Sequence, residues 1–234
     1  MSIRALLPLL HARAPIDIKT VELELDRQGD TQPPQNSADY RRVAQAKLQE
    51  RRALGSITGY FPVLWVDGTP IHEALAINEW TAEAYPAAQL WPTEPLRRAQ
   101  ARALACEMAS GFTHIRHNLS CHIFAHVPQP QLDGPTQEEI ARIFELSREA
   151  LQRSGGPFLF GPFGIVDAMY LPVYTRFATY NIPLPSDLTA YQTSLNALPA
   201  TQQWRTMASN APAIPIYDDY IEQLGGSVGL PSNN

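Results

Sequence analysis

Hydrophobic and polar positions predict a mixed α/β arrangement in the first part of the chain. Between Ile16 and Leu25 apolar and charged residues alternate, which is the period of a half-buried strand. The apolar run 61–66, the turn Asp67-Gly68 and a return strand from Thr69 predict a β-hairpin. A polar loop is expected at 29–36. Helices are predicted at Ile3–His11, from Ser37 or Asp39 to about Ala53, and at Glu73–Tyr85.

The second part of the chain carries helical patterning almost throughout. Residues 86–95 contain three prolines and show no period, so they predict a linker. We therefore expect two domains, 1–86 and 96–234, joined by residues 87–95. Helices are predicted at Leu96–Leu119, Thr136–Arg153, Ile165–Tyr180, Ser186–Leu195 and Thr201–Ala208.

Composition narrows the classes of function. The 234 residues carry a net charge of −5 and no basic cluster, which argues against nucleic acid as the main partner. Two cysteines in a chain of this length favour a reducing compartment, so we expect a cytoplasmic protein. No apolar run reaches the roughly 18 residues that a membrane span requires, and we expect no membrane partner.

Several short motifs, in order, resemble the glutathione S-transferase family, in particular its cytosolic members of bacterial type. The match begins with a proline-valine strand, a turn and a helix start, and it continues through a linker and the opening of a core helix. The matching segments are Phe61-Pro62-Val63-Leu64, Asp67-Gly68, Glu73-Ala74-Leu75-Ala76-Ile77, Leu90-Trp91-Pro92, Glu107–Phe112 with Arg116, and Phe158–Ala168 with Arg176-Phe177.

The resemblance implies a thioredoxin-like α/β N-terminal domain followed by an all-α C-terminal domain. It also implies glutathione as the cofactor, a small-molecule electrophile as the second substrate, and a homodimer. The family's first helix aligns with Ser2–Ala12, which places the first β-strand of the fold before Met1. The N-terminus is therefore expected to be truncated relative to the family.

The segment around Pro62 and Glu73 is the expected glutathione site. By resemblance, Pro62 is cis and the backbone of Val63 pairs with the cysteinyl part of glutathione. Glu73 holds the γ-glutamyl amino group, and the helix that starts there favours the ligand's carboxylate. Ala74 stands where the family has a serine, so one hydroxyl donor is lost while the backbone N–H remains.

A basic helix offers cations for the glycine carboxylate of glutathione. Arg51 is our candidate there, with Lys47 and Arg52 beside it. A solvated charged face is the alternative explanation for most of these residues.

The group that activates the glutathione thiol is expected at the N-terminus of the chain. Lowering a thiol pKa by two units from about 8.5 requires about 2.7 kcal/mol. A helix end supplies about 0.3–1 kcal/mol, and a hydrogen bond to the charged sulfur supplies about 1.5–3 kcal/mol. The family's catalytic serine or cysteine aligns just before Ser2, so Ser2 is the candidate donor. Its alternative role is a helix N-cap.

The second-substrate pocket is expected on the predicted helix 96–119. Ser110, His114, His117 and Cys121 follow helical spacing and form one stripe, with Thr113 and Arg116 beside it. The pocket candidates are Ser110, Thr113, Arg116 and His117.

The histidines near Cys121 also raise a metal hypothesis, but no matched carboxylate or second cysteine completes a known spacing, so we predict no metal site. Asp167 is expected to reach back to the backbone N–H at its helix start. The leading function is transfer of glutathione to an electrophile. A non-catalytic interaction protein of the same fold and a glutathione-dependent isomerase or lyase remain alternatives.

Overall fold

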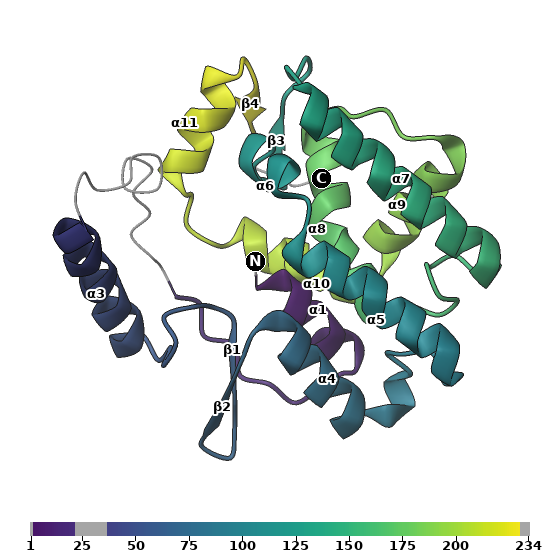
Figure 1. The fold of residues 1–234 in the computed structure, drawn as a ribbon, viewed down its shortest axis with the longest axis horizontal. Helices are drawn as coiled ribbons and strands as arrows, with labels where there is room; N and C mark the ends of the chain where they lie inside the picture. The colour runs from purple at the N-terminus through teal and green to yellow at the C-terminus, as the bar shows by residue number, and fades with distance from the viewer. Residues whose placement is uncertain (1, 22–36, 230–234) are drawn as a thin grey trace.

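The computed structural model describes residues 2–21 and 37–229, and most of these are helical (Figure 1). Strands are short and form two separate two-stranded sheets. The helices are α1 Ile3–His11, α3 Ser37–Ala53, α4 Ala74–Ala84, η1 Pro86–Ala88, α5 Pro95–Ser110, α6 Thr113–Asn118, α7 Gly134–Ser154, α8 Ile165–Thr179, α9 Ser186–Ala197, α10 Pro199–Ser209 and α11 Pro215–Gln223. The strands are β1 Val63–Val66, β2 Thr69–His72, β3 Ala125–His126 and β4 Ser227–Val228.

The predicted hairpin is present. β1 and β2 pair antiparallel, with Val63 opposite His72 and Val66 opposite Thr69. Asp67 and Gly68 form the turn with φ of 47° and 78°. Two left-handed residues match the twist of the flanking strands, which is why an Asp-Gly pair is favoured there.

A small core joins the hairpin to the first helix. Ala5 and Leu9 of α1 are buried together with Ala74 and Ile77 of α4. Leu64 and Ile71 of the hairpin, which lie opposite each other in the register, pack against this cluster. The hairpin, the start of α4 and α1 are therefore held as one unit.

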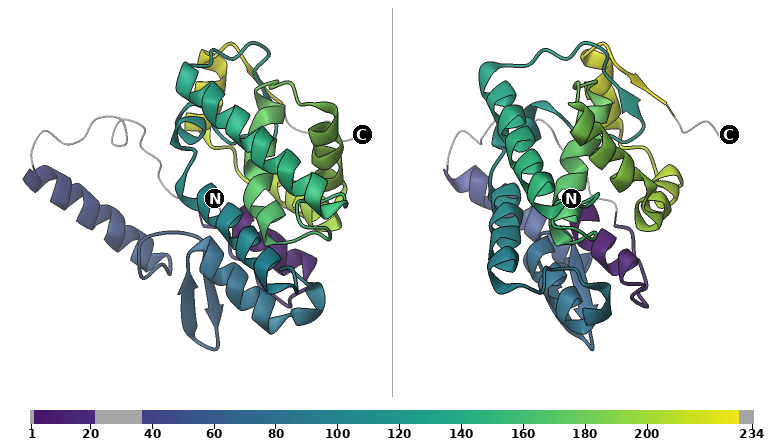
Figure 2. Two further views of the ribbon diagram at one scale, coloured as in Figure 1. Left: turned by 45° about the vertical axis from the view of Figure 1, so that its right-hand side comes forward. Right: turned by 90° about the vertical axis from the view of Figure 1, so that its right-hand side faces the viewer.

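The main core surrounds α8, which runs through the middle of the helices (Figure 2). Nearly every residue of α8 is buried, from Ile165 to Thr179. A helix that is apolar on all sides is stable only when other elements surround it. Ile3 and Leu7 of α1 belong to this core, so α1 packs between α4 and α8.

The single helix predicted for 96–119 is wrong. The chain leaves the helix at Gly111, and Phe112 adopts a left-handed conformation with φ of 57° before α6 begins. Two side chains stabilise the break, one from α6 and one from α7. The Arg116 guanidinium donates to carbonyl oxygens at the end of α5, including that of Gly111 at 3.0 Å. The Glu139 carboxylate of α7 accepts from the backbone N–H of Ile115 at 2.8 Å.

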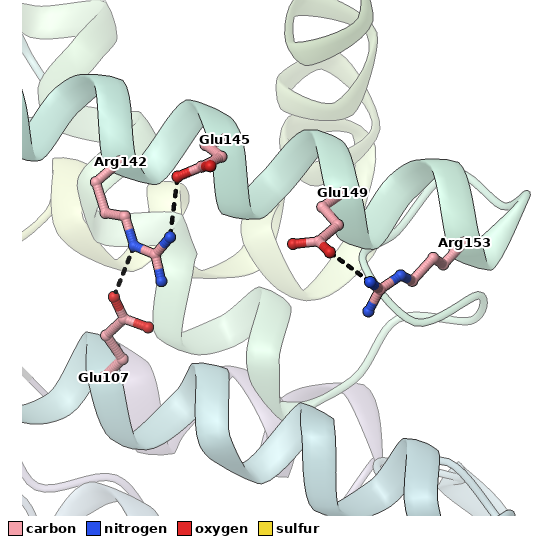
Figure 3. Close-up of polar contacts among 5 residues, drawn as sticks. All are labelled: Glu107, Arg142, Glu145, Glu149 and Arg153. Atoms are coloured by element: carbon pink, nitrogen blue, oxygen red, sulfur yellow. Dashed lines mark hydrogen bonds and ion pairs between the residues drawn. The ribbon is translucent and has the colours of Figure 1, made fainter.

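Exposed ion pairs line α7 where it passes α5 (Figure 3). The Arg142 guanidinium contacts Glu107 of α5 at 3.2 Å and Glu145 of α7 at 2.9 Å. Arg153 pairs with Glu149 within α7. All of these side chains are largely exposed, so the ion pairs are expected to contribute little to the free energy of unfolding.

Other differences from the sequence predictions concern residues 16–21, the helix α11 and the strands β3 and β4. Residues 16–21 form no regular strand, and the rest of the predicted strand 16–25 and the loop 29–36 lie outside the described residues. The helix α11 and the pair β3–β4 have no predicted counterpart. No helix among the described residues is long and apolar enough to cross a membrane.

Candidate functional site

Glu73 occupies the N-cap position of α4. It has a φ of 74°, and its Oε2 accepts a hydrogen bond from the Ala74 N–H at 3.1 Å. The side chain is exposed, while Ala74 is buried. The first turn of α4 contains no acidic residue. Glu73 therefore combines a carboxylate with the positive end of a helix dipole at the same surface position.

The register of the hairpin brings Val63 next to this helix start. Val63 pairs with His72, and His72 directly precedes Glu73. The Phe61–Pro62 bond is cis, as the sequence resemblance predicted. His72 Nδ1 lies 3.1 Å from the hydroxyl of Thr58, which ties the preceding loop to β2. An extended backbone, a carboxylate and a helix N-terminus thus converge, and this set fits an extended peptide with a free amino group.

Arg51 lies at the end of α3. Its Nη1 donates to the Gly59 carbonyl at 3.0 Å, and the hydroxyl of Ser56 donates to the Tyr60 carbonyl at 2.6 Å. These bonds shape the loop that leads into Pro62. The proposed contact of Arg51 with a ligand carboxylate stays a prediction.

Ser2 is the N-cap of α1 and is exposed. Its carbonyl accepts from the N–H groups of Ala5 and Leu6, but its side chain makes no capping hydrogen bond. The hydroxyl is thus available at the helix start, where a thiol donor was predicted.

The break at Phe112 divides the predicted pocket stripe. Ser110 ends α5, where its hydroxyl donates to the Cys106 carbonyl at 3.0 Å. Thr113 and His117 are exposed on α6, and Arg116 is half-buried. The expected single helical stripe is therefore wrong, because two separate helices carry these residues. Their pocket roles stay predictions.

Solved structures with the same arrangement of elements were found across nearly the whole chain. A glutathione transferase homologue from Burkholderia with bound glutathione superposes with a TM-score of 0.63 at 21% identity, covering 90% of this chain and 92% of that chain. An epsilon-class glutathione S-transferase from the housefly Musca domestica gives 0.60 at 20% identity, covering 88% and 91%. This chain has the fold of the glutathione S-transferase superfamily. The fold that the sequence resemblance implied is confirmed.

The curated sequence relatives of this chain are named as maleylacetoacetate isomerases. A probable maleylacetoacetate isomerase from Caenorhabditis elegans is 40% identical over 76 residues, 32% of this chain and 33% of the relative. The maleylacetoacetate isomerase of Mus musculus is 29% identical over 133 residues, 56% and 58% of the two chains. These matches thus span from a third to less than two thirds of the relatives' length. No family model matches the chain.

One buried charge of this glutathione S-transferase-fold chain escaped the sequence analysis. Arg4 of α1 is only 7% exposed, and its Nε has no hydrogen-bond partner among the described residues. Burial, followed by the positive charges of Arg116 and Arg176, lowers the pKa of Arg4 to about 10. The only sequence signal was an arginine inside an apolar helix start.

Cys121 lies near these arginines, after the end of α6. Its Sγ is 3.8 Å from the Pro172 carbonyl oxygen, and burial raises the pKa of its thiol. A thiol with a raised pKa stays protonated and is a weak nucleophile. Within residues 2–21 and 37–229, no group of three or more His, Cys, Asp or Glu residues is placed to hold a metal ion.

Proposed function

We propose that the chain binds glutathione along Val63, Glu73 and Ala74 and uses it to conjugate or rearrange an electrophilic small molecule. The observation that carries the proposal is the pairing of Val63 with His72, which places the strand beside the N-terminus of α4. The glutathione-bound Burkholderia homologue of the same fold supports it.

Each residue of the proposed glutathione site has a different role. The backbone of Val63 can pair with an extended ligand, and the exposed Glu73 carboxylate can accept from an ammonium group. The Ala74 N–H lies at the positive helix end, which favours a ligand carboxylate. Glutathione, when bound, supplies a thiol for reaction with the electrophile. Ser2 is the group that we propose to stabilise its thiolate.

Rearrangement is the form of the reaction that we favour. The relatives that match part of the chain carry the name maleylacetoacetate isomerase. A glutathione-dependent isomerase returns its cofactor unchanged, so its product contains no glutathione. Mass spectrometry of products formed from electrophilic test substrates distinguishes isomerisation from conjugation.

Calorimetric titration with glutathione tests the binding step. We expect saturable binding, and we expect Glu73→Ala to weaken it about 10- to 100-fold, because a charge-assisted hydrogen bond is worth about 1.5–3 kcal/mol. Glu83→Ala is the matched control, since Glu83 is exposed on the same helix. No binding by the parent chain would instead favour the non-catalytic interaction protein.

Three further features stand as proposals with this function. They are a homodimer, a cytoplasmic location, and the division into 1–86 and 96–234. Light scattering of the purified chain tests the first, and limited proteolysis within 87–95 tests the last.

A further inference from the structure

Pro8 lies inside α1 and deprives one carbonyl of that helix of its ordinary partner. In an α-helix each carbonyl accepts from the N–H four residues further along the chain, so the Arg4 carbonyl would need an N–H at position 8. Proline has no N–H, and its ring crowds the carbonyl four residues before it. Because Arg4 is buried, its carbonyl needs a donor from elsewhere in the protein.

Asn78 of α4 supplies this donor. Its Nδ2 donates to the Arg4 carbonyl at 3.1 Å, although the two residues are 74 positions apart in the sequence. The Asn78 side chain is fully buried, and its Nδ2 also lies 3.9 Å from the sulfur of Met169 in α8. One hydrogen bond thus joins α1 to α4 at the place where Pro8 interrupts the hydrogen bonding of α1.

Packing alone does not explain an asparagine at position 78. Its Oδ1 is buried and has no hydrogen-bond partner among the described residues. A buried polar atom without a partner destabilises the folded state, and an apolar side chain of the same size would avoid that penalty. What only a donor at this position provides is the bond from Nδ2 to the Arg4 carbonyl.

This bond links the two helices that carry the proposed glutathione site. Glu73 is the N-cap of α4, so Glu73 and Asn78 belong to the first turns of one helix. Ser2 is the N-cap of α1, and its carbonyl accepts from the N–H groups of Ala5 and Leu6 at 3.1 and 3.0 Å. A shift of the first turn of α1 relative to α4 would therefore move the Ser2 hydroxyl relative to Glu73.

We propose that Asn78 is a positioning residue that fixes the first turn of α1 and so holds the Ser2 hydroxyl at the thiol of glutathione bound at Glu73. The inference rests on the proposed function, because Asn78 acts through Ser2. Asn78 is fully buried and does not itself contact the ligand. Its loss therefore affects the ionisation of the bound thiol, whereas glutathione affinity depends on Val63 and Glu73.

The ultraviolet absorbance of the thiolate, titrated against pH in the full chain saturated with glutathione, tests the inference. Asn78→Leu is expected to lower the thiolate fraction at neutral pH about threefold to tenfold, because a displaced donor stabilises the charged sulfur less. Calorimetry should show glutathione affinity changed by less than about twofold. An unchanged thiolate fraction in Asn78→Leu overturns the proposal.

A double-mutant cycle with Ser2 shows whether Asn78 acts through that hydroxyl. In a Ser2→Ala background, Asn78→Leu is expected to have no further effect on the thiolate fraction, because the group that it positions is already absent. An equal loss in both backgrounds overturns the proposal, since Asn78 would then act by another route.

Pro8→Ala is the rescue variant. It restores an N–H at position 8, so the Arg4 carbonyl regains a donor within its own helix. With Pro8→Ala present, Asn78→Leu is expected to keep a thiolate fraction within about twofold of the parent. A folded double variant that shows no recovery overturns the proposal.

Thr81→Val is the matched structural control. Thr81 is buried on the same helix, and its hydroxyl donates to the Ile77 carbonyl at 2.7 Å. Its loss removes a buried hydrogen bond from α4 without touching α1, so stability should fall while the thiolate fraction stays unchanged. A thiolate loss equal to that of Asn78→Leu would mean that general loosening of α4 is the cause, and it would overturn the proposal.

A milder variant serves if Asn78→Leu does not fold. The hydroxyl of Asn78→Thr is expected to donate to the carbonyl four residues before it, as that of Thr81 does, so the Arg4 carbonyl again loses its donor and the same outcomes apply. The two levels of failure stay separate. A parent chain that binds no glutathione removes the proposed function and this inference with it. Binding by the parent with equal thiolate fractions in parent and variant removes the inference alone.

Discussion

The hydroxyl of Tyr191 donates to Oδ1 of Asp167 over 2.9 Å in the centre of the helical core. The same carboxylate accepts from the N–H of Leu159 at 3.0 Å and of Gly164 at 2.9 Å. Asp167 therefore fastens the loop before α8 and the helix α9 to the start of α8. Only the bond to Gly164 was predicted from the sequence.

Asp167 makes stability depend on pH. Burial raises the pKa of Asp167 to about 6, above the unfolded value of about 3.9. The folded state thus binds this proton more tightly. Protonation of Asp167 therefore stabilises the folded state. This stabilisation, about 3 kcal/mol, is complete below about pH 4 and is lost as the pH rises through 6.

Urea unfolding of the parent and Asp167→Asn between pH 4 and 7 measures this contribution. The stability difference between them is expected to shrink as pH rises, because only the parent titrates at this position. A difference that does not change with pH would contradict the assignment.

Gly164 leaves no room for a side chain. A Cβ at this position would lie 2.8 Å from the Leu90 carbonyl oxygen, which accepts from the Ile165 N–H at 3.0 Å. We expect Gly164→Ala to cost about 1–3 kcal/mol in denaturant unfolding. Gly134→Ala is the control, because a Cβ there meets no atom within 4 Å. Equal effects of the two changes would argue against the close approach.

Asp218 holds α11 to the rest of the chain. Its Oδ1 lies 2.7 Å from His122 Nε2, and His122 Nδ1 accepts from the Phe124 N–H, so Nε2 carries the donated proton. Asp218→Ala is expected to cost about 1–3 kcal/mol and to speed hydrogen exchange in α11. The neighbouring exposed Asp219 provides the control variant Asp219→Ala, for which neither change is expected.

The Arg142 ion pairs in Figure 3 are expected to matter little. Arg142 is 48% exposed, so water screens both contacts and the long side chain loses entropy when it is held. Arg142→Ala should change the free energy of unfolding by less than about 1 kcal/mol. A loss above about 2 kcal/mol would mean that α5 and α7 depend on this contact.

Ser2→Ala tests the proposed thiol donor. If the Ser2 hydroxyl stabilises the thiolate, its loss should slow the glutathione-dependent reaction about tenfold or more, because such a bond is worth about 1.5–3 kcal/mol. Glutathione affinity should change little. An unchanged rate at several pH values would remove Ser2 from the mechanism.

Local turn and cap chemistry explains what the sequence predicted well. Asp67-Gly68 specifies the hairpin turn, and Glu73 marks the start of α4, so this part of the candidate site follows from neighbouring residues. The superfamily fold was predicted from several such segments in order.

Long-range contacts explain what was missed. Gly111 alone did not predict the end of α5, because the break depends on Arg116 and on Glu139 from another helix. The burial of Arg4 likewise depends on α8, far along the chain. Hydrophobic periodicity within one segment contains neither of these facts.

The position of α1 between α4 and α8 has a consequence for biosynthesis. α1 is synthesised long before α8 and α10, yet Ile3 and Leu7 belong to the main core and α1 packs against both of these helices. Until α8 and α10 emerge, the nascent chain presents an apolar stripe with two of its three helical partners missing. Chaperone demand should therefore peak late in translation and fall once Ser209, the last residue of α10, has left the ribosome.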